Sequence, residues 1–202
     1  VLRQRAGDGG VATATRVLGE SGFEVLDLHH LDHEAQMRCA RDMRGGNWGP
    51  GPYSTNGGPP FAMIVAIDRE PQLPSRSQLE RYPGLTNANI VRAKEAIRSA
   101  IGAGLSDAEL YNPVHSSDNE ADTWAYITLG APHEVQRLQQ MVAERRPEIA
   151  APSSPTEQER RSVVAPRTIP RRLVSRLLRI PRRARAFAAY RLAKWRLAQL
   201  PR

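Results

Sequence analysis

The sequence predicts an α+β sandwich built on a small sheet, followed by a basic helical extension. Two observations carry this prediction. Apolar residues recur at helical and at strand spacing in alternating segments of residues 1–146, and charge is divided unevenly between the two ends of the chain. The chain has 202 residues, 40% of them hydrophobic, which is enough for one modest core. Its single cysteine, Cys39, excludes an internal disulfide and a cysteine-based metal cluster.

The first half of the chain is expected to alternate between helices and strands. Apolar positions three and four residues apart indicate helices, and alternation indicates a half-buried strand. Asp32 is a suitable N-cap for the second helix, and a run rich in glycine, proline and asparagine after that helix indicates a loop. The predicted elements are a helix over 11–21, a strand over 23–28, a helix over 32–43, a loop over 44–60 and a strand over 61–67.

The second half is expected to be mainly helical. Residues 68–84 are polar and contain prolines, so we expect an irregular stretch there. Ile90, Ala93, Ile97 and Ile101 share one face of a helix. The predicted elements are a helix over 87–101, a short strand ending at His115, a helix that Asp118 opens and that runs through Tyr126, and a helix over 132–145.

The charge distribution separates an acidic body from a basic tail. Residues 160–202 hold 14 of the 29 lysine and arginine residues and no aspartate or glutamate, which leaves a net charge of −6 on residues 1–159. The stretch between the two parts is rich in proline and serine, a composition typical of linkers. We therefore predict a domain over 1–146, a linker over 147–168 and a tail over 169–202.

The tail has the pattern of basic amphipathic helices. Leu173, Leu177 and Ile180 share a helical face among arginines, and Pro181 separates them from a second run that contains Trp195. Its apolar content favours an anionic membrane surface or a protein partner over nucleic acid. No apolar run reaches the roughly 18 residues that a membrane span needs. We therefore expect a cytoplasmic location, peripheral at the membrane.

The segment 112–118, Asn-Pro-Val-His-Ser-Ser-Asp, is the strongest candidate for chemistry. The neutral imidazole of His115 is a competent nucleophile near pH 7, and Ser117 and Asp118 are suited to capping the following helix. Short motifs of this kind often occur without a function. On spacing alone, the pattern therefore favours a turn histidine beside an N-cap over a nucleophile.

The same segment resembles the active-site motif of nucleoside diphosphate kinases, Asn-x-x-His-(Gly/Ala)-Ser-Asp. Other segments are similar to motifs of that family and occur in the family's order over roughly residues 1–130. They are Gly-Phe-Glu-Val-Leu at 22–26, Gly-Pro-Pro-Phe-Ala-Met-Ile-Val at 58–65, Gly-Leu-Thr-Asn at 84–87 and Ile-Arg at 97–98. Several collinear motifs are hard to obtain by chance, so the resemblance favours the catalytic interpretation of His115.

The resemblance implies a ferredoxin-like α/β sandwich with a small antiparallel sheet. It also implies a ping-pong phosphotransferase that moves the γ-phosphoryl group of a nucleoside triphosphate to a diphosphate through a phosphohistidine at His115. Arg98 would clamp phosphate, Thr86 would donate its hydroxyl to phosphate, and Asn112 would bond the ribose or phosphate edge. In the alternative, Arg98 is a solvated helix arginine and Thr86 is the N-cap of the 87–101 helix.

Cofactor and partners also follow from the resemblance. Mg²⁺ would be carried by the phosphates of ATP or another nucleoside triphosphate, so no protein metal ligand is predicted. Ser117 and Asp118 would support the histidine loop, and Trp48 is a candidate for stacking on the base. Members of the family assemble into oligomers, which implies a homo-oligomer here.

Four departures from the family's pattern favour a different class of function. Ser116 stands where the family has Gly or Ala, Ala88 replaces a proline, and Tyr126 stands in place of the glutamate that orients the family's histidine. Only Val-Leu-Arg at 1–3 matches the family's opening Lys-Pro-Asp-Gly-Val-x-Arg, which places the first strand and a phosphate-binding lysine upstream of residue 1. The alternative is a catalytically weak nucleotide-binding or scaffold module, whose tail docks on a membrane, a protein or nucleic acid.

A second group of potential ligands is formed by His29, His30 and His33, with Asp27 and Asp32 nearby. Histidine is a common metal ligand, so the group is a conceivable metal site. Its position at the end of a predicted strand and the start of a helix favours loop and capping roles instead.

Overall fold

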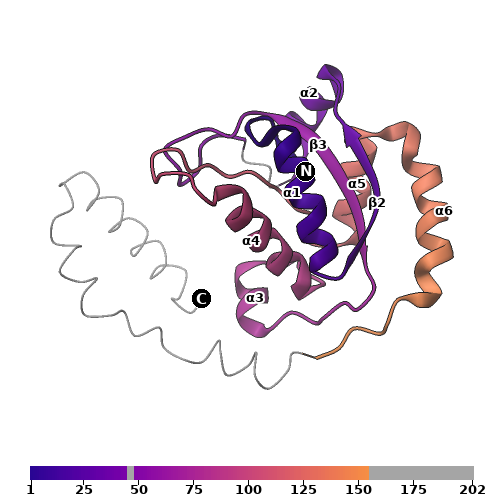
Figure 1. The fold of residues 1–202 in the computed structure, drawn as a ribbon. Coiled ribbons are helices and arrows are strands. Elements are labelled where there is room, and N and C mark those ends of the chain that lie inside the picture. Colours follow the sequence, from indigo (N-terminus) through magenta and orange to yellow (C-terminus); the bar gives the residue numbers. More distant parts are fainter. Residues whose placement is uncertain (45–47, 155–202) are drawn as a thin grey trace, which may run out of the picture. The chain divides into compact units, whose positions relative to one another are not determined.

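The computed structural model describes residues 1–44 and 48–154, and within them the chain forms a three-stranded sheet and six α-helices (Figure 1). This confirms the predicted mixed α/β fold with a small antiparallel sheet. The elements are β1 (Leu2–Arg3), α1 (Gly7–Glu20), β2 (Phe23–His30), α2 (His33–Asp42), β3 (Pro60–Asp68), α3 (Arg76–Arg81), α4 (Ala88–Gly102), α5 (Glu120–Gly130) and α6 (Val135–Arg145), with short 3-10 turns η1 (Gln4–Ala6), η2 (Pro132–Glu134) and η3 (Arg146–Glu148).

The sheet has the order β1-β3-β2, and both neighbours run antiparallel to β3. The apolar run at 60–68 suits the central strand because both of its faces are covered. β1 pairs only through Leu2 with Ala62 and Arg3 with Pro60. On its other side, residues 113–115 lie against residues 1–3, where the Arg3 amide donates to the Pro113 carbonyl at 3.0 Å. The short strand predicted to end at His115 is thus reduced to a single bridge between Leu2 and Val114.

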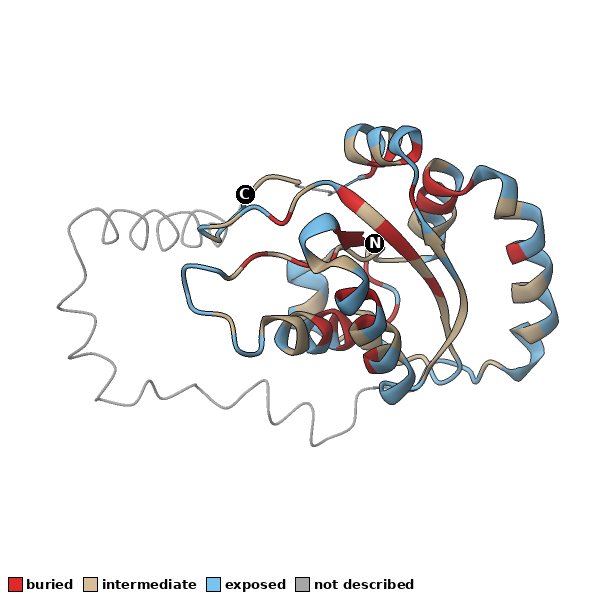
Figure 2. Cartoon of the chain, turned by 45° about the horizontal axis from the view of Figure 1, so that its top comes forward, coloured by how far each residue is buried: buried red, intermediate tan, exposed pale blue. Residues whose placement is uncertain are grey.

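Alternate residues of β3 divide the core into two layers. Ala62 packs with Val17 of α1 and Ile97 of α4 on one face. On the other face, Met63 packs with side chains of α2, α5 and α6, namely Ala35, Cys39, Tyr126, Ile127 and Leu138. Figure 2 shows the buried residues concentrated on β3 and on the helix surfaces that face it. The period-2 pattern of one strand therefore decides which helices share a layer.

Gly130 marks a close approach within the second layer. A Cβ atom at this position would lie 2.5 Å from Met63 Cε and 3.1 Å from Leu31 Cδ2. Those distances are too short for a side chain, so glycine allows α5 to end directly against the sheet.

The predicted N-cap residue is present at α2, whereas α4 and α5 are capped by residues other than the predicted ones. The Asp32 carboxylate accepts a hydrogen bond from the Ala35 amide at 2.8 Å, as predicted. Asn87, not Thr86, caps α4, and Asn119, not Ser117 or Asp118, caps α5. At α5 the backbone of Asn119 is extended and its side chain accepts from the Asp122 amide, so the helix starts at Glu120, two residues after Asp118.

The stretch 68–84 was expected to be irregular because of its prolines, but it contains the short helix α3. Ser75 and Gln78 form a capping box, in which the Ser75 hydroxyl accepts from the Gln78 amide and the Gln78 side chain accepts from the Ser75 amide. This local pairing starts α3 immediately after Pro74.

The first residues of the predicted linker lie along residues 69–73. The Ala150 amide donates to the Arg69 carbonyl at 2.9 Å, and the Leu73 amide donates to the Ser153 carbonyl at 2.8 Å. The remainder of that linker and the predicted tail over 169–202 lie outside the described residues. Among the helices of the described part, none combines the length and the apolar character needed to cross a bilayer.

Candidate functional site

His115 lies where two cavities meet. The smaller cavity has a volume of about 290 Å³, and the larger has about 520 Å³. Four residues line both cavities: Lys94, His115, Ser116 and Tyr126. The imidazole is held at this junction because residues 113–115 run beside β1 while α5 begins only five residues after His115.

The Tyr126 hydroxyl determines how the imidazole of His115 is protonated. Tyr126 Oη donates to the Arg44 carbonyl and lies 3.2 Å from His115 Nε2. A hydroxyl has one proton, so once that proton is donated to Arg44 its oxygen accepts from Nε2–H. This arrangement favours the Nε2–H tautomer and leaves the lone pair on Nδ1, which is the nucleophilic form of the ring.

The imidazole is neutral over the physiological pH range. Burial lowers the pKa of His115 from its ordinary value to about 4, and nearby positive charges, including Lys94 and Arg98, act in the same direction. Burial also raises the pKa of Tyr126 to about 12, with the Asp122 carboxylate adding to the effect. Both members of this pair are therefore uncharged near pH 7.

The smaller cavity is strongly basic. Arg3, Arg44, Lys94 and Arg98 line it together with a single carboxylate from the described residues, Asp118. Arg44 is paired with Asp122, and Arg3 donates to the 48–58 loop, so Lys94 and Arg98 are the basic residues best placed to suit an anionic ligand beside the histidine.

Arg98 is held in place by the His115 segment itself. Its Nε donates to Asn112 Oδ1 at 3.1 Å, and a terminal nitrogen donates to the Val114 carbonyl at 3.2 Å. Arg98 and Asn112, both singled out from the sequence, are thus in direct contact in the smaller cavity. These two bonds use Nε and one terminal nitrogen of the guanidinium, and the side chain forms part of the lining of the smaller cavity.

Arg3 has a structural role at the edge of the same cavity. The residue is 1% exposed, and its guanidinium donates to the Gly58 carbonyl at 2.8 Å, the Gly49 carbonyl at 3.1 Å and Asn56 Oδ1 at 2.8 Å. It also donates to the Trp48 carbonyl. These bonds fold the glycine-rich 48–58 loop over the site.

Two buried polar atoms at the cavity have no hydrogen-bond partner among the described residues. They are Trp48 Nε1 and Ser116 Oγ. The Trp48 ring meets the His115 ring edge-on, with 6.0 Å between centroids. Polar groups buried without partners are uncommon in folded proteins and are typical of a site completed by a ligand or water.

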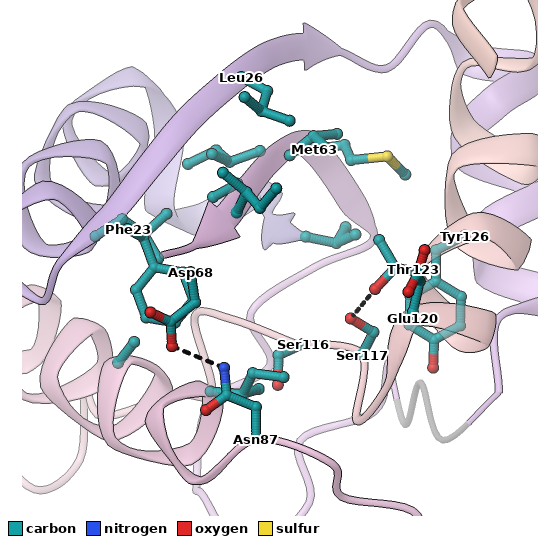
Figure 3. Close-up of a pocket in the computed structure, with 18 of the residues that line it drawn as sticks. Phe23, Leu26, Met63, Asp68, Asn87, Ser116, Ser117, Glu120, Thr123 and Tyr126 are labelled. Carbon is teal, nitrogen blue, oxygen red and sulfur yellow. Dashed lines mark hydrogen bonds between the residues drawn. The ribbon is translucent and has the colours of Figure 1, made fainter. Parts of the chain in front are cut away.

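The larger cavity is lined by apolar residues of the sheet and of α4, and polar side chains enter it from the His115 segment and from Asp68. Figure 3 shows Leu26 and Met63 of the sheet across from the hydroxyls of Ser116 and Ser117. Ser117 Oγ and Thr123 Oγ1 are 2.7 Å apart. Since Thr123 donates to the Asn119 carbonyl, Ser117 donates to Thr123, and this bond ties the His115 segment to α5.

The residues predicted from the sequence are divided between the two cavities. The smaller cavity brings together His115, Arg98, Asn112, Asp118 and Trp48, whereas Thr86 and Ser117 line only the larger one. Thr86 is exposed, and its backbone amide donates to the Asp118 carbonyl at 3.0 Å.

Sequence reasoning missed Lys94, Arg44 and Tyr82, which all line the smaller cavity. A signal for Lys94 was present, because it lies at i+4 from Ile90 and i−3 from Ile97 on the apolar face of the helix. A charged residue on a buried helical face needs a reason. Arg44 and Tyr82 carry no such signal in the sequence.

Asp27, His29 and Glu134 form a separate group whose ligand atoms lie within 4.8 Å of one another. Arg137 forms ion pairs with both carboxylates of this group, so a guanidinium already neutralises it. His30 lies instead near Asp8, at 3.9 Å. We assign no role to this group, whose carboxylates are both paired with Arg137.

No protein-family model matches the chain, and neither the curated proteins nor the solved structures include a significant match to it.

Proposed function

We propose that the chain is a phosphotransferase similar to nucleoside diphosphate kinases and that His115 carries the phosphoryl group. The observation that carries the proposal is the placement of a neutral imidazole, whose Nε2 contacts the Tyr126 hydroxyl, in a cavity lined by Lys94 and Arg98. Phosphoryl transfer depends mainly on positioning and on positive charge around the transferred group. His115, Lys94 and Arg98 supply both requirements.

In the proposed reaction, Nδ1 of His115 attacks the γ-phosphorus of a nucleoside triphosphate. The bond between that phosphorus and its bridging oxygen breaks, and the diphosphate leaves with the electron pair. A terminal oxygen of a second diphosphate then attacks the phosphohistidine, the N–P bond breaks, and the neutral imidazole is restored. Throughout, Nε2–H stays hydrogen-bonded to Tyr126, and Arg98 balances the charge on the equatorial oxygens.

The strand arrangement supports the ferredoxin-like form of the fold. Along the chain, β1, α1, β2, β3, α4 and the bridge segment at Val114 follow one another in a β-α-β-β-α-β order, with α2 inserted between β2 and β3 and α3 inserted between β3 and α4. Across the sheet, Val114 lies beside β1, which is followed by β3 and β2.

Magnesium would reach this site on the phosphates of the nucleotide. Protein sites for Mg²⁺ use one or two carboxylates together with substrate phosphates, and Asp118 is the one carboxylate that the described residues place at the smaller cavity. These residues do not form a cage for the metal by themselves, so no step is assigned to it.

The decisive experiment is incubation of the protein with ATP labelled at the γ-phosphate. We expect a covalent label that survives alkali and is lost in acid, as phosphohistidine is, and that is absent from His115→Ala. The matched control is His133→Ala, which removes an exposed histidine from η2 and should label like the wild type.

Two results would count against catalysis. A label of unchanged intensity on His115→Ala would exclude this histidine as the carrier. No label on the wild type, together with measurable ADP binding, would favour the alternative of a nucleotide-binding module without transfer activity.

A further inference from the structure

Lys94 is a buried cation that the fold itself does not neutralise by hydrogen bonding. Its side chain extends from α4, and the residue is 8% exposed. The ammonium lies 4.8 Å from the centroid of the Tyr82 ring, and the hydrogen bonds of the described residues include none from it. Its Nζ atom is not among the fully buried polar atoms without partners, which is consistent with its opening onto the cavity that Lys94 lines. A buried ammonium is normally paired and hydrogen-bonded, since burial otherwise disfavours the charged form.

The surroundings of Lys94 add more donors than acceptors. Arg98 follows one turn later on the same helix, and the orphan atoms Trp48 Nε1 and Ser116 Oγ line the same cavity. The acidic neighbours that favour the ammonium are Asp118 and Glu95, while Arg98 and Arg81 oppose it. Burial and the nearby guanidinium groups lower the pKa of Lys94. A compact oxyanion with several acceptor oxygens would satisfy this set of donors.

We propose that Lys94 binds the phosphoryl group that reacts with His115, as the lysine ligand of the site. The identification of that anion as a transferred phosphoryl group rests on the proposed function, whereas anion binding by Lys94 does not. The ammonium comes from α4, the helix that also carries Arg98. Lys94 and Arg98 then contact the same phosphoryl group from adjacent turns of one helix.

The first test measures pyrophosphate and ADP binding by calorimetry for the wild type and for Lys94→Met. Methionine keeps an unbranched side chain of similar length but removes the charge and all three donors. Loss of a charge-assisted hydrogen bond should weaken both affinities by about ten-fold or more. The control, Arg76→Met, removes one positive charge from the exposed face of α3 and should bind within about two-fold of the wild type. Equal affinities for Lys94→Met and the wild type would overturn the proposal.

A second test needs no change at Lys94 and therefore no assumption about folding of a variant. The chain contains two lysines, Lys94 and Lys194, so selective ¹³Cε labelling of lysine gives two NMR signals. In Lys194→Arg the remaining signal is that of Lys94. We expect it to shift saturably with pyrophosphate, at the dissociation constant measured by calorimetry, and an unmoved signal at saturation would contradict the assignment.

The two proposals fail in different ways. The protein could form a phosphohistidine at His115 while the NMR signal of Lys94 does not shift with pyrophosphate. That result would support the transferase proposal and contradict the proposed role of Lys94. A Lys94 signal that responds to pyrophosphate, in a protein that never labels, would retain the anion site and reject the transferase.

Discussion

At the scale of the residue, the site depends on one hydroxyl that both donates and accepts. Tyr126 gives its proton to the Arg44 carbonyl and therefore accepts from Nε2 of His115. A carboxylate at this position would accept the same hydrogen bond while adding a negative charge to the smaller cavity. With tyrosine, the imidazole is oriented and the cavity keeps its positive charge.

Replacing Tyr126 by phenylalanine tests this role directly. We expect the ¹⁵N spectrum of His115 to change from the Nε2–H tautomer to a mixture of both tautomers. The initial rate of labelling should fall on the order of ten-fold, which corresponds to one neutral hydrogen bond of about 1.4 kcal/mol. The control is Tyr111→Phe, a buried tyrosine whose ring packs against Arg5. A tautomer that stays unchanged in Tyr126→Phe would exclude Tyr126 as the residue that positions the imidazole.

At the scale of the element, β1 does more than extend the sheet. The strand has only two residues, yet the guanidinium of one of them, Arg3, donates hydrogen bonds to four acceptors of the 48–58 loop. Gly57 keeps that loop close, since a Cβ atom there would lie 2.9 Å from the Asn112 carbonyl. The strand, the loop and the His115 segment therefore form one hydrogen-bonded unit.

Arg3→Met should disconnect this unit. The substitution leaves buried carbonyl groups without donors, so we expect a loss of about 2–4 kcal/mol in the free energy of unfolding. Urea titration followed by tryptophan fluorescence provides the measurement. Arg5→Met is the control, because Arg5 is exposed and stacks on Tyr111. A loss at Arg3 no larger than at Arg5 would show that the loop is held by other contacts.

At the scale of the whole molecule, the buried histidine couples the site to stability. The unfolded chain protonates His115 near pH 6.5, whereas the folded protein protonates it only near pH 4. Between these values the unfolded state binds more protons, so the stability contributed by His115 is present above pH 6.5 and is lost as the pH falls towards 4.

The expected size of this loss is about 3 kcal/mol across the interval. Acidic groups also titrate there, so the quantity to measure is the difference between the wild type and His115→Gln in the free energy of unfolding from pH 7 to pH 4. Stability of the glutamine variant should decline less steeply. His133→Gln, which removes an exposed histidine, should follow the wild type. Parallel curves for the wild type and His115→Gln would contradict a depressed pKa for His115.

Much of this fold was accessible from local patterns in the sequence. The alternation at 23–28 and the apolar run at 61–67 correspond to β2 and β3, and the apolar stripe of 87–101 corresponds to α4. These patterns are reliable because periodicity and capping involve residues a few positions apart. The start of α5 was predicted two residues too early, because serine, aspartate and asparagine are all good caps and adjacent candidates compete.

Local sequence patterns located two of the strands and most of the helices, and they marked the His115 segment as the place to expect chemistry. Which side chains surround that histidine depends on the tertiary structure. Lys94 and Tyr126 reach it from different helices, and Thr86 opens onto the larger cavity rather than the smaller one. The physical reason is that a helical period places a residue on a face, whereas the contents of a cavity depend on contacts between segments distant in the chain.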